Sequence, residues 1–233
     1  MYSEPLEKQR DFFDKIHHQY NQARILNTSL HTRFEINEII HRIGKSLDEY
    51  IADFGAGSGR IAIPLLQKGY KVHAIDVSTK SLTNLRSLAH KLHLISLRTT
   101  AHFPAGETFN HIVGADILHH VDLDEVIPQL WKKLKKGGRA IFSEPNAYHL
   151  AWYLYLPFAS DWSIEKGILR CRYFHLIKKF KMHGFRSVSI TGFGFLPTPL
   201  CTWSKKLCKL NNRLGNLPII KLFAYRFIIE AVK

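Results

Sequence analysis

The chain has 233 residues, of which 45% are hydrophobic and 22% are charged. This composition provides enough apolar side chains for one substantial core, and it excludes a disordered or collagen-like chain. The three cysteines, Cys171, Cys201 and Cys208, show no C-x-x-C spacing, so neither a disulfide framework nor a zinc ribbon is supported. We therefore expect one domain in a reducing, cytoplasmic setting.

The formal net charge of +14 at pH 7 is distributed unevenly along the chain. Up to Glu144 there are 19 basic and 16 acidic residues, a balance of +3, whereas from Pro145 onward there are 14 basic and 3 acidic residues, a balance of +11. This skew favours an anionic partner, namely phosphate, a nucleic acid or an anionic membrane face. The alternative is a solvated basic face without a partner.

Helical patterns occupy residues 5–26 and 33–44. The mixed charges at the start do not predict a secretory signal, and no later stretch predicts a membrane-spanning helix. Short β-rich runs then alternate with helical patterns. Strands are expected at 51–54, 71–76, 95–99, 111–115 and 139–143, and helices at 82–92 and 126–134. The second of these helices is expected to stop at Gly137-Gly138. Such alternation predicts βαβ units and a parallel sheet.

After Glu144 the pattern changes to an aromatic stretch at 148–158, a helix at 173–183 and two more strands at 186–191 and 222–232. The predicted fold is therefore α/β, a doubly wound, mostly parallel sheet of about seven strands. We expect one domain with an N-terminal helical cover (1–47), a cofactor-binding core (48–146), a substrate-cover insertion (147–184) and the last two strands with a basic loop (185–233). Both covers are expected over the carboxyl edge of the sheet.

The strongest motif is Asp53-Phe-Gly55-Ala-Gly57-Ser-Gly59, which directly follows a predicted strand and precedes a helix. Glycines at this point allow a ligand to approach the backbone closely, next to the positive end of the helix dipole. Asp76 follows 21 residues after Gly55, at the end of the second strand, where it is placed to bind a ribose diol. The alternative role for Asp76 is to cap the next helix.

The glycine spacing differs from that of dinucleotide-binding proteins. The pattern G-x-G-x-x-G needs glycine at position 60, where this chain has Arg60. Asp53, two residues before the first glycine, suits a cationic amino group better than a pyrophosphate. The expected ligand therefore has a ribose and a positively charged end, and no diphosphate.

These residues resemble those of the class I S-adenosylmethionine-dependent methyltransferases, especially the small-molecule branch that includes the ubiquinone-biosynthesis methyltransferases. The resemblance is good over residues 48–146 and loose elsewhere. The matching motifs are Asp53-Phe-Gly-Ala-Gly-Ser-Gly, Ala74-Ile-Asp-Val-Ser, Phe109-Asn-His-Ile-Val-Gly-Ala-Asp-Ile-Leu-His-His-Val, Leu134-Lys-Lys-Gly-Gly and Ser143-Glu-Pro-Asn. The fold implied is the Rossmann-like methyltransferase fold, with S-adenosylmethionine as cofactor and S-adenosylhomocysteine as product.

The resemblance also implies roles for individual residues. Gly55 and Gly57 would approach the methionine moiety, Asp53 its amino group, Asp76 the ribose and Val77 the adenine. The whole expected cofactor site is Asp53, Gly55, Ala56, Gly57, Gly59, Asp76, Val77, Thr100, Ala115 and Asp116. The chain departs from the family at Thr99-Thr100-Ala101-His102, where an acid is common, and at Asn110, where aspartate is usual.

Methyl transfer depends mainly on positioning, since the sulfonium is already activated, and a base is needed only if the acceptor must lose a proton. Candidates for that base are His119 and His120 after the fourth strand and Glu144 after the fifth. A structural role for them is the alternative. Tyr20 and the pair His17-His18 could close over the cofactor.

The aromatic stretch 148–158 supplies the expected substrate residues, namely Tyr148, Trp152 and Tyr155, together with Tyr20. With Lys166, Arg170 and Arg172 nearby, this stretch could also contact an anionic membrane peripherally. The alternative is a helix packed on the core. No metal site is expected, because the histidines show no H-E-x-x-H spacing.

The predicted function is S-adenosylmethionine-dependent methyl transfer to a small or lipid-like acceptor, for which a quinone precursor, a polyketide and a phosphorylated sugar or lipid are the options. An RNA methyltransferase is a less favoured alternative, because the N/D-P-P-Y/F motif of base methylation is missing. A protein that binds the cofactor without catalysis is the third option.

Overall fold

A seven-stranded sheet forms the centre of the computed structural model, which describes residues 25–45, 48–159 and 162–233. The strand order is β3-β2-β1-β4-β5-β7-β6, and β7 runs antiparallel to both of its neighbours while the other strands run parallel. The strands are β1 (Tyr50–Phe54), β2 (Lys71–Ile75), β3 (Leu97–Thr100), β4 (Phe109–Ala115), β5 (Leu134–Pro145), β6 (Ser187–Phe193) and β7 (Arg226–Val232). The predicted doubly wound, mostly parallel sheet is confirmed.

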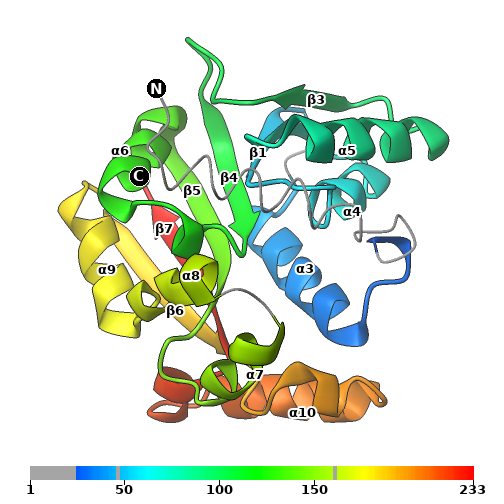
Figure 1. The fold of residues 1–233 in the computed structure, drawn as a ribbon. Coiled ribbons are helices and arrows are strands. Elements are labelled where there is room, and N and C mark those ends of the chain that lie inside the picture. The colour runs from blue at the N-terminus through cyan, green and yellow to red at the C-terminus, as the bar shows by residue number, and fades with distance from the viewer. Residues whose placement is uncertain (1–24, 46–47, 160–161) are drawn as a thin grey trace.

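Helices cover both faces of this sheet (Figure 1). On one face lie α3 (Leu30–Ile43), α4 (Ala62–Gln67) and α5 (Thr79–Lys91), and on the other lie α6 (Leu123–Lys133) and α9 (Tyr173–Met182). The side chains of each strand alternate between the two layers. In β5, for example, Ile141 packs with the first set of helices and Phe142 with the second.

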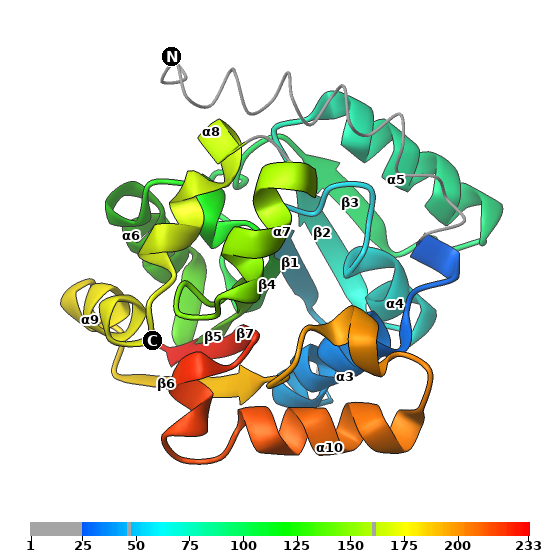
Figure 2. The same cartoon turned by 60° about the horizontal axis from the view of Figure 1, so that its bottom comes forward.

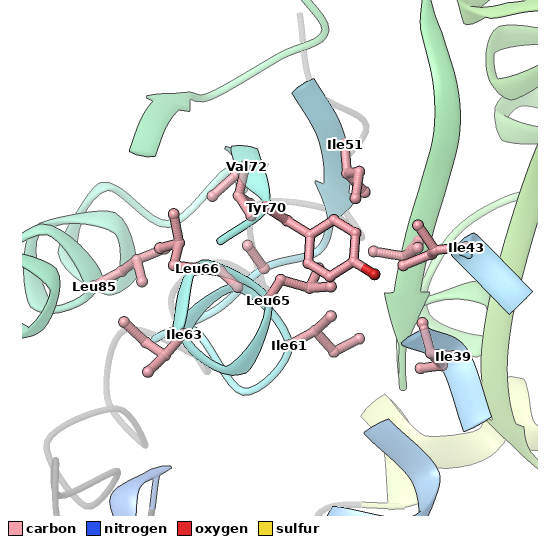
Figure 3. Packing of buried hydrophobic residues seen from close by; sticks show 14 of the residues in the cluster. Ile39, Ile43, Ile51, Ile61, Ile63, Leu65, Leu66, Tyr70, Val72 and Leu85 are labelled. Carbon is pink, nitrogen blue, oxygen red and sulfur yellow. The ribbon is translucent and has the colours of Figure 1, made fainter. Parts of the chain in front are cut away.

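The first layer is built from aliphatic side chains that recur at helical spacing. Ile39 and Ile43 of α3 pack beside Ile51 of β1, and Leu65 of α4 joins them (Figure 3). Each fully buried side chain of this size contributes about 1.5–3 kcal/mol through the hydrophobic effect. The hydroxyl of Tyr70 donates to the carbonyl of Gly44 at 2.7 Å, so the one polar atom on this side chain is satisfied.

Several boundaries differ from the predicted ones, and for two of them the structure shows the reason. The helix α6 ends at Lys133, because Leu134 already has extended backbone angles and pairs with Phe109 of β4. Gly137-Gly138 therefore lies inside β5, where the register against β4 shifts, and does not end the helix as predicted. In the last strand, residues 220–223 form the short helix η4 (Ile220–Phe223), so β7 begins later than expected.

Smaller elements gather at the carboxyl edge of the sheet (Figure 2). They are η1 (Leu118–His120), α7 (Ala151–Ala159), α8 (Trp162–Glu165), η2 (Lys166–Arg170), η3 (Thr198–Cys201) and α10 (Lys205–Gly215). Helix α3 packs on a face of the sheet, and the expected N-terminal cover stays a prediction. Most of the predicted helix 5–26 lies outside the described residues, as do Tyr20, His17 and His18.

None of the helices in the described ranges is both long and apolar enough to cross a bilayer. The proposed division into four segments stays a prediction, because the layers of the core include residues from before and after the expected core segment, such as Ile39 and Ile228.

Candidate functional site

The glycine loop after β1 is tied to the end of β2. The amides of Gly55 and Ala56 both donate to the carbonyl of Ile75, at 2.9 and 3.1 Å, and the amide of Gly57 donates to the Asp76 carboxylate at 2.7 Å. The residues of the first two predicted motifs, which are 21 positions apart, therefore lie in direct contact. This contact fixes the loop over the carboxyl ends of two neighbouring strands.

The three glycines of the loop have positive φ angles of 74° at Gly55, 51° at Gly57 and 103° at Gly59, a region that side chains rarely adopt. A Cβ at Gly55 would lie 2.6 Å from the side chain of Ile117, and a Cβ at Gly59 would lie 2.5 Å from Leu85 of α5. Gly59 is therefore needed for packing between the loop and α5, in addition to any contact with a ligand.

Asp53 ends β1 with a carboxylate that is 1% exposed, and neither oxygen has a hydrogen-bond partner among the described residues. Burial, and then the negative charge of Asp76, raise its pKa to about 7, against weaker opposing effects of the Ala62 amide and Arg60. A buried acid without a partner is costly. A cationic ligand group beside it would remove that cost, which is the property expected of a residue that binds the amino group of S-adenosylmethionine.

Asp76 accepts hydrogen bonds from the amides of Gly57 at 2.7 Å and Ser78 at 2.8 Å, one on each oxygen. A carboxylate oxygen can accept more than one hydrogen bond, so these two amide bonds do not by themselves exclude a ribose diol. The cap of α5 is Ser78, whose hydroxyl accepts from the Ser81 amide. Ser78, and not Asp76, therefore caps this helix. Val77, which follows Asp76, is half-buried.

The remaining predicted cofactor residues differ in their surroundings. Ala56 is buried and Ala115 is half-buried at the end of β4. The hydroxyl of Thr100 donates to the carbonyl of His102 at 2.7 Å and lies 2.9 Å from Nε2 of His73. Thr100 therefore supports its own turn, and its role toward an adenine stays a prediction.

Asp116 belongs to a buried network of charges. Its carboxylate pairs with Arg60 at 2.7 Å and with Arg226 at 2.5 Å, and these two arginines outweigh burial and hold its pKa well below the ordinary value. Glu35 of α3, which is 2% exposed, pairs with Arg226 at 3.1 Å and accepts a hydrogen bond from Ser143. The predicted cofactor contact of Asp116 thus competes with two ion pairs.

Sequence reasoning missed three members of this network, namely Glu35, Arg60 as an ion-pair partner, and Arg226. The available signals were weak: Glu35 interrupts the apolar face of its helix, and Arg226 begins a mostly apolar strand. Their partners are 25 or more positions away, so no local spacing reveals the pairs.

His119 lies between two carboxylates. Its Nδ1 is 2.7 Å from Glu144 and its Nε2 is 3.5 Å from Glu165. The other oxygen of Glu144 accepts from the amides of Ile117 and Leu118, at 2.9 and 2.8 Å. Burial lowers the pKa of His119, but the hydrogen bonds to Glu144 and Glu165 outweigh burial and raise the pKa to about 9.

This geometry favours the structural alternative for His119 and Glu144, and a catalytic role for either residue stays a prediction. An imidazole with a pKa of about 9 is already protonated at pH 7, and Glu144 uses its oxygens to hold η1 and His119. The pair therefore fits the alternative structural role. His120, which is 8% exposed, has its ring centroid 3.9 Å from that of His119.

The same cluster contains groups that could ligate a metal. Donor atoms of His119, Glu144 and Cys171 lie within 4.8 Å of one another, and so do those of His119, His120 and Glu165. Metal binding would require His119 to lose a proton, since only neutral imidazole is a ligand. That no metal is used stays a prediction.

The predicted substrate residues are divided between the core and the surface. Trp152 is 9% exposed, stacks on Tyr225 with ring centroids 4.4 Å apart, and donates its indole N–H to the Tyr225 carbonyl at 2.9 Å. Trp152 thus fits the alternative of a helix packed on the core. Tyr148 and Tyr155 are 41% and 60% exposed and remain available to an acceptor.

Comparisons with known proteins find similarity to methyltransferases. Residues 52–142 match the family described as methyltransferase domain. The chain is 29% identical over 146 residues to a ubiquinone biosynthesis O-methyltransferase of Rickettsia typhi, covering 58% of this chain and 58% of that protein. An uncharacterized Haemophilus influenzae protein is 31% identical over 105 residues, which are 42% of this chain and 39% of that one. The chain thus spans about two fifths to three fifths of the length of these relatives.

Two solved structures have the same fold. Magnesium protoporphyrin IX methyltransferase of Synechocystis PCC 6803 with bound S-adenosylhomocysteine has a TM-score of 0.65 and 18% identity, covering 99% of this chain and 100% of that one. Phosphoethanolamine N-methyltransferase 2 of Haemonchus contortus with S-adenosylmethionine has a TM-score of 0.67 and 19% identity, covering 96% and 59%.

The match over residues 52–142, the related sequences and the shared fold agree with the resemblance of this chain to the class I S-adenosylmethionine-dependent methyltransferases of the small-molecule type. The resemblance seen in the sequence is confirmed, and these two solved structures hold S-adenosylhomocysteine or S-adenosylmethionine, the cofactor expected for this chain.

The charge state of His119 predicts how stability changes with pH. Because the pKa of His119 is raised from 6.5 to about 9 on folding, its stabilisation is complete below pH 6.5 and is lost as the pH rises to 9, by about 3 kcal/mol in all. Urea unfolding at a series of pH values above 7 measures this loss. His119→Asn should flatten the dependence, whereas His90→Asn at an exposed site should retain it. An unchanged slope in His119→Asn would contradict the assignment.

Proposed function

We propose that this protein is an enzyme that transfers the methyl group of S-adenosylmethionine to a small or lipid-like acceptor. The observation that carries the proposal is the buried Asp53 carboxylate, which lacks a hydrogen-bond partner among the described residues and lies beside the glycine loop and Asp76. Such a group at the carboxyl edge of a parallel sheet suits a cationic nucleoside ligand. The related methyltransferases support the same reaction class.

The chain's own residues would hold the cofactor at three points. Asp53 would bind the amino group, Gly55 and Gly57 would leave room for the methionine moiety, and Asp76 would accept hydrogen bonds from the ribose. When bound, the sulfonium supplies an activated methyl group. The protein then contributes orientation and exclusion of water, which can lower the barrier by about 7–11 kcal/mol.

The acceptor would approach past the segment after β5. Tyr148 and Tyr155 expose aromatic surface there, and Leu150 and Leu154 are also exposed. This lining favours an apolar or aromatic acceptor, such as a quinone precursor or a polyketide. The basic residues of the last third would suit a phosphorylated sugar or lipid. The names of related proteins, which include ubiquinone biosynthesis and phosphoethanolamine methylation, support both kinds.

The reaction is tested by transfer of a labelled methyl group. The purified protein is incubated with methyl-labelled S-adenosylmethionine and, separately, with a prenylated catechol, an aromatic polyketide, phosphoethanolamine and total RNA. We expect label in one of the three small-molecule classes and none in RNA. Label in RNA alone would replace the proposal by the RNA alternative, and cofactor binding without transfer to any acceptor, including extracted host metabolites, would favour a non-catalytic binding protein.

Asp53 should make cofactor affinity depend on pH. A cationic amino group beside this acid favours its charged form, so below its pKa of about 7 the affinity for S-adenosylhomocysteine should fall about tenfold per pH unit. Titration calorimetry between about pH 5.5 and 8, the range around this pKa, measures the effect.

Two variants separate the roles of the acids in this experiment. Asp53→Asn should bind more weakly and lose the pH dependence. Asp76→Asn should also bind more weakly, but its pH dependence should remain and move to lower pH, because the charge of Asp76 helps to raise the pKa of Asp53. A pH-independent wild-type affinity would remove Asp53 from the cofactor site.

The substrate segment gives a second pair of variants. Tyr155→Ser should leave the melting temperature and cofactor affinity unchanged while raising KM for the acceptor, because this side chain is 60% exposed. Trp152→Ser should instead lower the free energy of unfolding by about 3–5 kcal/mol, since it removes a buried, stacked indole. Chemical denaturation and acceptor kinetics measure the two effects. Wild-type acceptor kinetics in Tyr155→Ser would exclude this tyrosine from the acceptor site.

A further inference from the structure

Helix α10 presents three different surfaces. Its buried side, formed by Cys208, Asn211 and Gly215, packs on β6 and the turn that follows it. The remaining positions divide into a leucine row and a basic row. Leu207 and Leu210 are 40% and 52% exposed, so these large apolar side chains are not used by the core.

The leucine row is part of a larger apolar surface. Helix α10 contacts both η3 and η4, and these segments expose further apolar side chains. We define the α10 surface by its exposed apolar residues, which are Leu200, Trp203, Leu207, Leu210, Leu214, Ile219 and Phe223. Trp203 is 80% exposed and Ile219 is 78% exposed. A patch of this kind on a folded protein indicates an interaction site.

The charge around this surface has one sign. Between residues 195 and 225 the sequence contains five basic residues and no acidic residue, which gives a balance of +5. The basic residues are Lys205, Lys206, Lys209, Arg213 and Lys221. At 100° per residue along α10, Lys206 and Arg213 lie beside the leucine row, on the side away from the protein core.

We propose that the α10 surface docks on an anionic lipid bilayer. Leucines and an exposed tryptophan enter the boundary between headgroups and acyl chains, while lysine and arginine at the rim reach the lipid phosphates, which is the pattern of interfacial helices. A nucleic acid would match the charge but would leave the leucine row in water. The uniform positive charge likewise selects an anionic surface over a neutral one.

The position of the α10 surface gives the docking a consequence for the enzyme. Helix α10 follows the carboxyl end of β6, and Figure 2 shows it at the carboxyl edge of the sheet. Docking would therefore hold that edge near the bilayer, where a lipid-like acceptor is concentrated. The docking itself rests on exposure and charge alone, and it does not require the proposed methyl transfer.

The test measures vesicle binding by flotation of the intact protein. Vesicles of phosphatidylcholine alone are compared with vesicles that contain about one third phosphatidylglycerol, at salt from about 0.05 to 0.5 M. We expect binding to the anionic vesicles only, decreasing as salt rises. Equal binding to both, or binding to neither, would overturn the proposal.

Matched variants locate the contact. Leu207→Gln with Leu210→Gln should reduce binding at least about tenfold, and Lys206→Gln with Arg213→Gln by about the same factor, since each cation near the surface contributes about fivefold. The controls are Ile95→Gln, an apolar residue that is 94% exposed before β3, and Lys68→Gln with Lys136→Gln. Both controls should bind as the wild type does.

Three further measurements make the result decisive. Circular dichroism and calorimetry with S-adenosylhomocysteine show whether the α10 variants are folded, and they also report on the cofactor site separately from docking. Vesicle binding by a folded leucine variant that equals that of the wild type would overturn the proposal. A wild-type dimer in light scattering that the leucine variant converts to a monomer would assign the α10 surface to a second copy of the chain instead.

Discussion

The balance of buried charge at the carboxyl edge of the sheet is the constraint on which the site depends. A parallel sheet collects the ends of its strands at one edge, and here those ends carry Asp53, Asp116 and Glu144, joined by Glu35 from α3. Removing a charge from water costs several kcal/mol unless a partner compensates for it. Arg60, Arg226 and His119 compensate for three of the four acids. Asp53 is the acid for which the described residues supply no hydrogen bond or ion pair.

This distribution of partners separates structural acids from ligand-binding acids. Glu144 fixes η1 through two amides and His119, and Glu35 joins α3 to β7 through Arg226. Breaking such a pair typically costs about 3–5 kcal/mol, because the remaining charge stays buried. These residues therefore position the loops around the site. Asp53, in contrast, gains most from a cation that arrives with the cofactor, which links the protonation of the free protein to cofactor binding.

The last third of the chain contains both buried and exposed aromatic residues, and only their surroundings distinguish them. Trp152 and Tyr225 stack in the interior, whereas Trp203 and Tyr155 are largely exposed. The exposed Trp203 lies in a basic segment, since no acidic residue occurs between 195 and 225. Five of the 14 basic residues after Glu144 therefore lie in and beside α10, outside the segment after β5 where a membrane contact was expected.

The sequence alone determined the strand order along the chain, the glycine loop and the cofactor class, because the period of apolar residues and the spacing of Asp53, Gly55 and Asp76 are local properties. It could not determine where α6 ends, since pairing of Leu134 with β4 overrides the later glycine pair. Nor could it show that His119 is held between two acids or that Glu35 meets Arg226. These contacts join positions 25 to 191 residues apart, and only the packing of helices on the sheet brings them together. Whether a charged side chain is paired, and hence what chemistry it can perform, is decided by that packing.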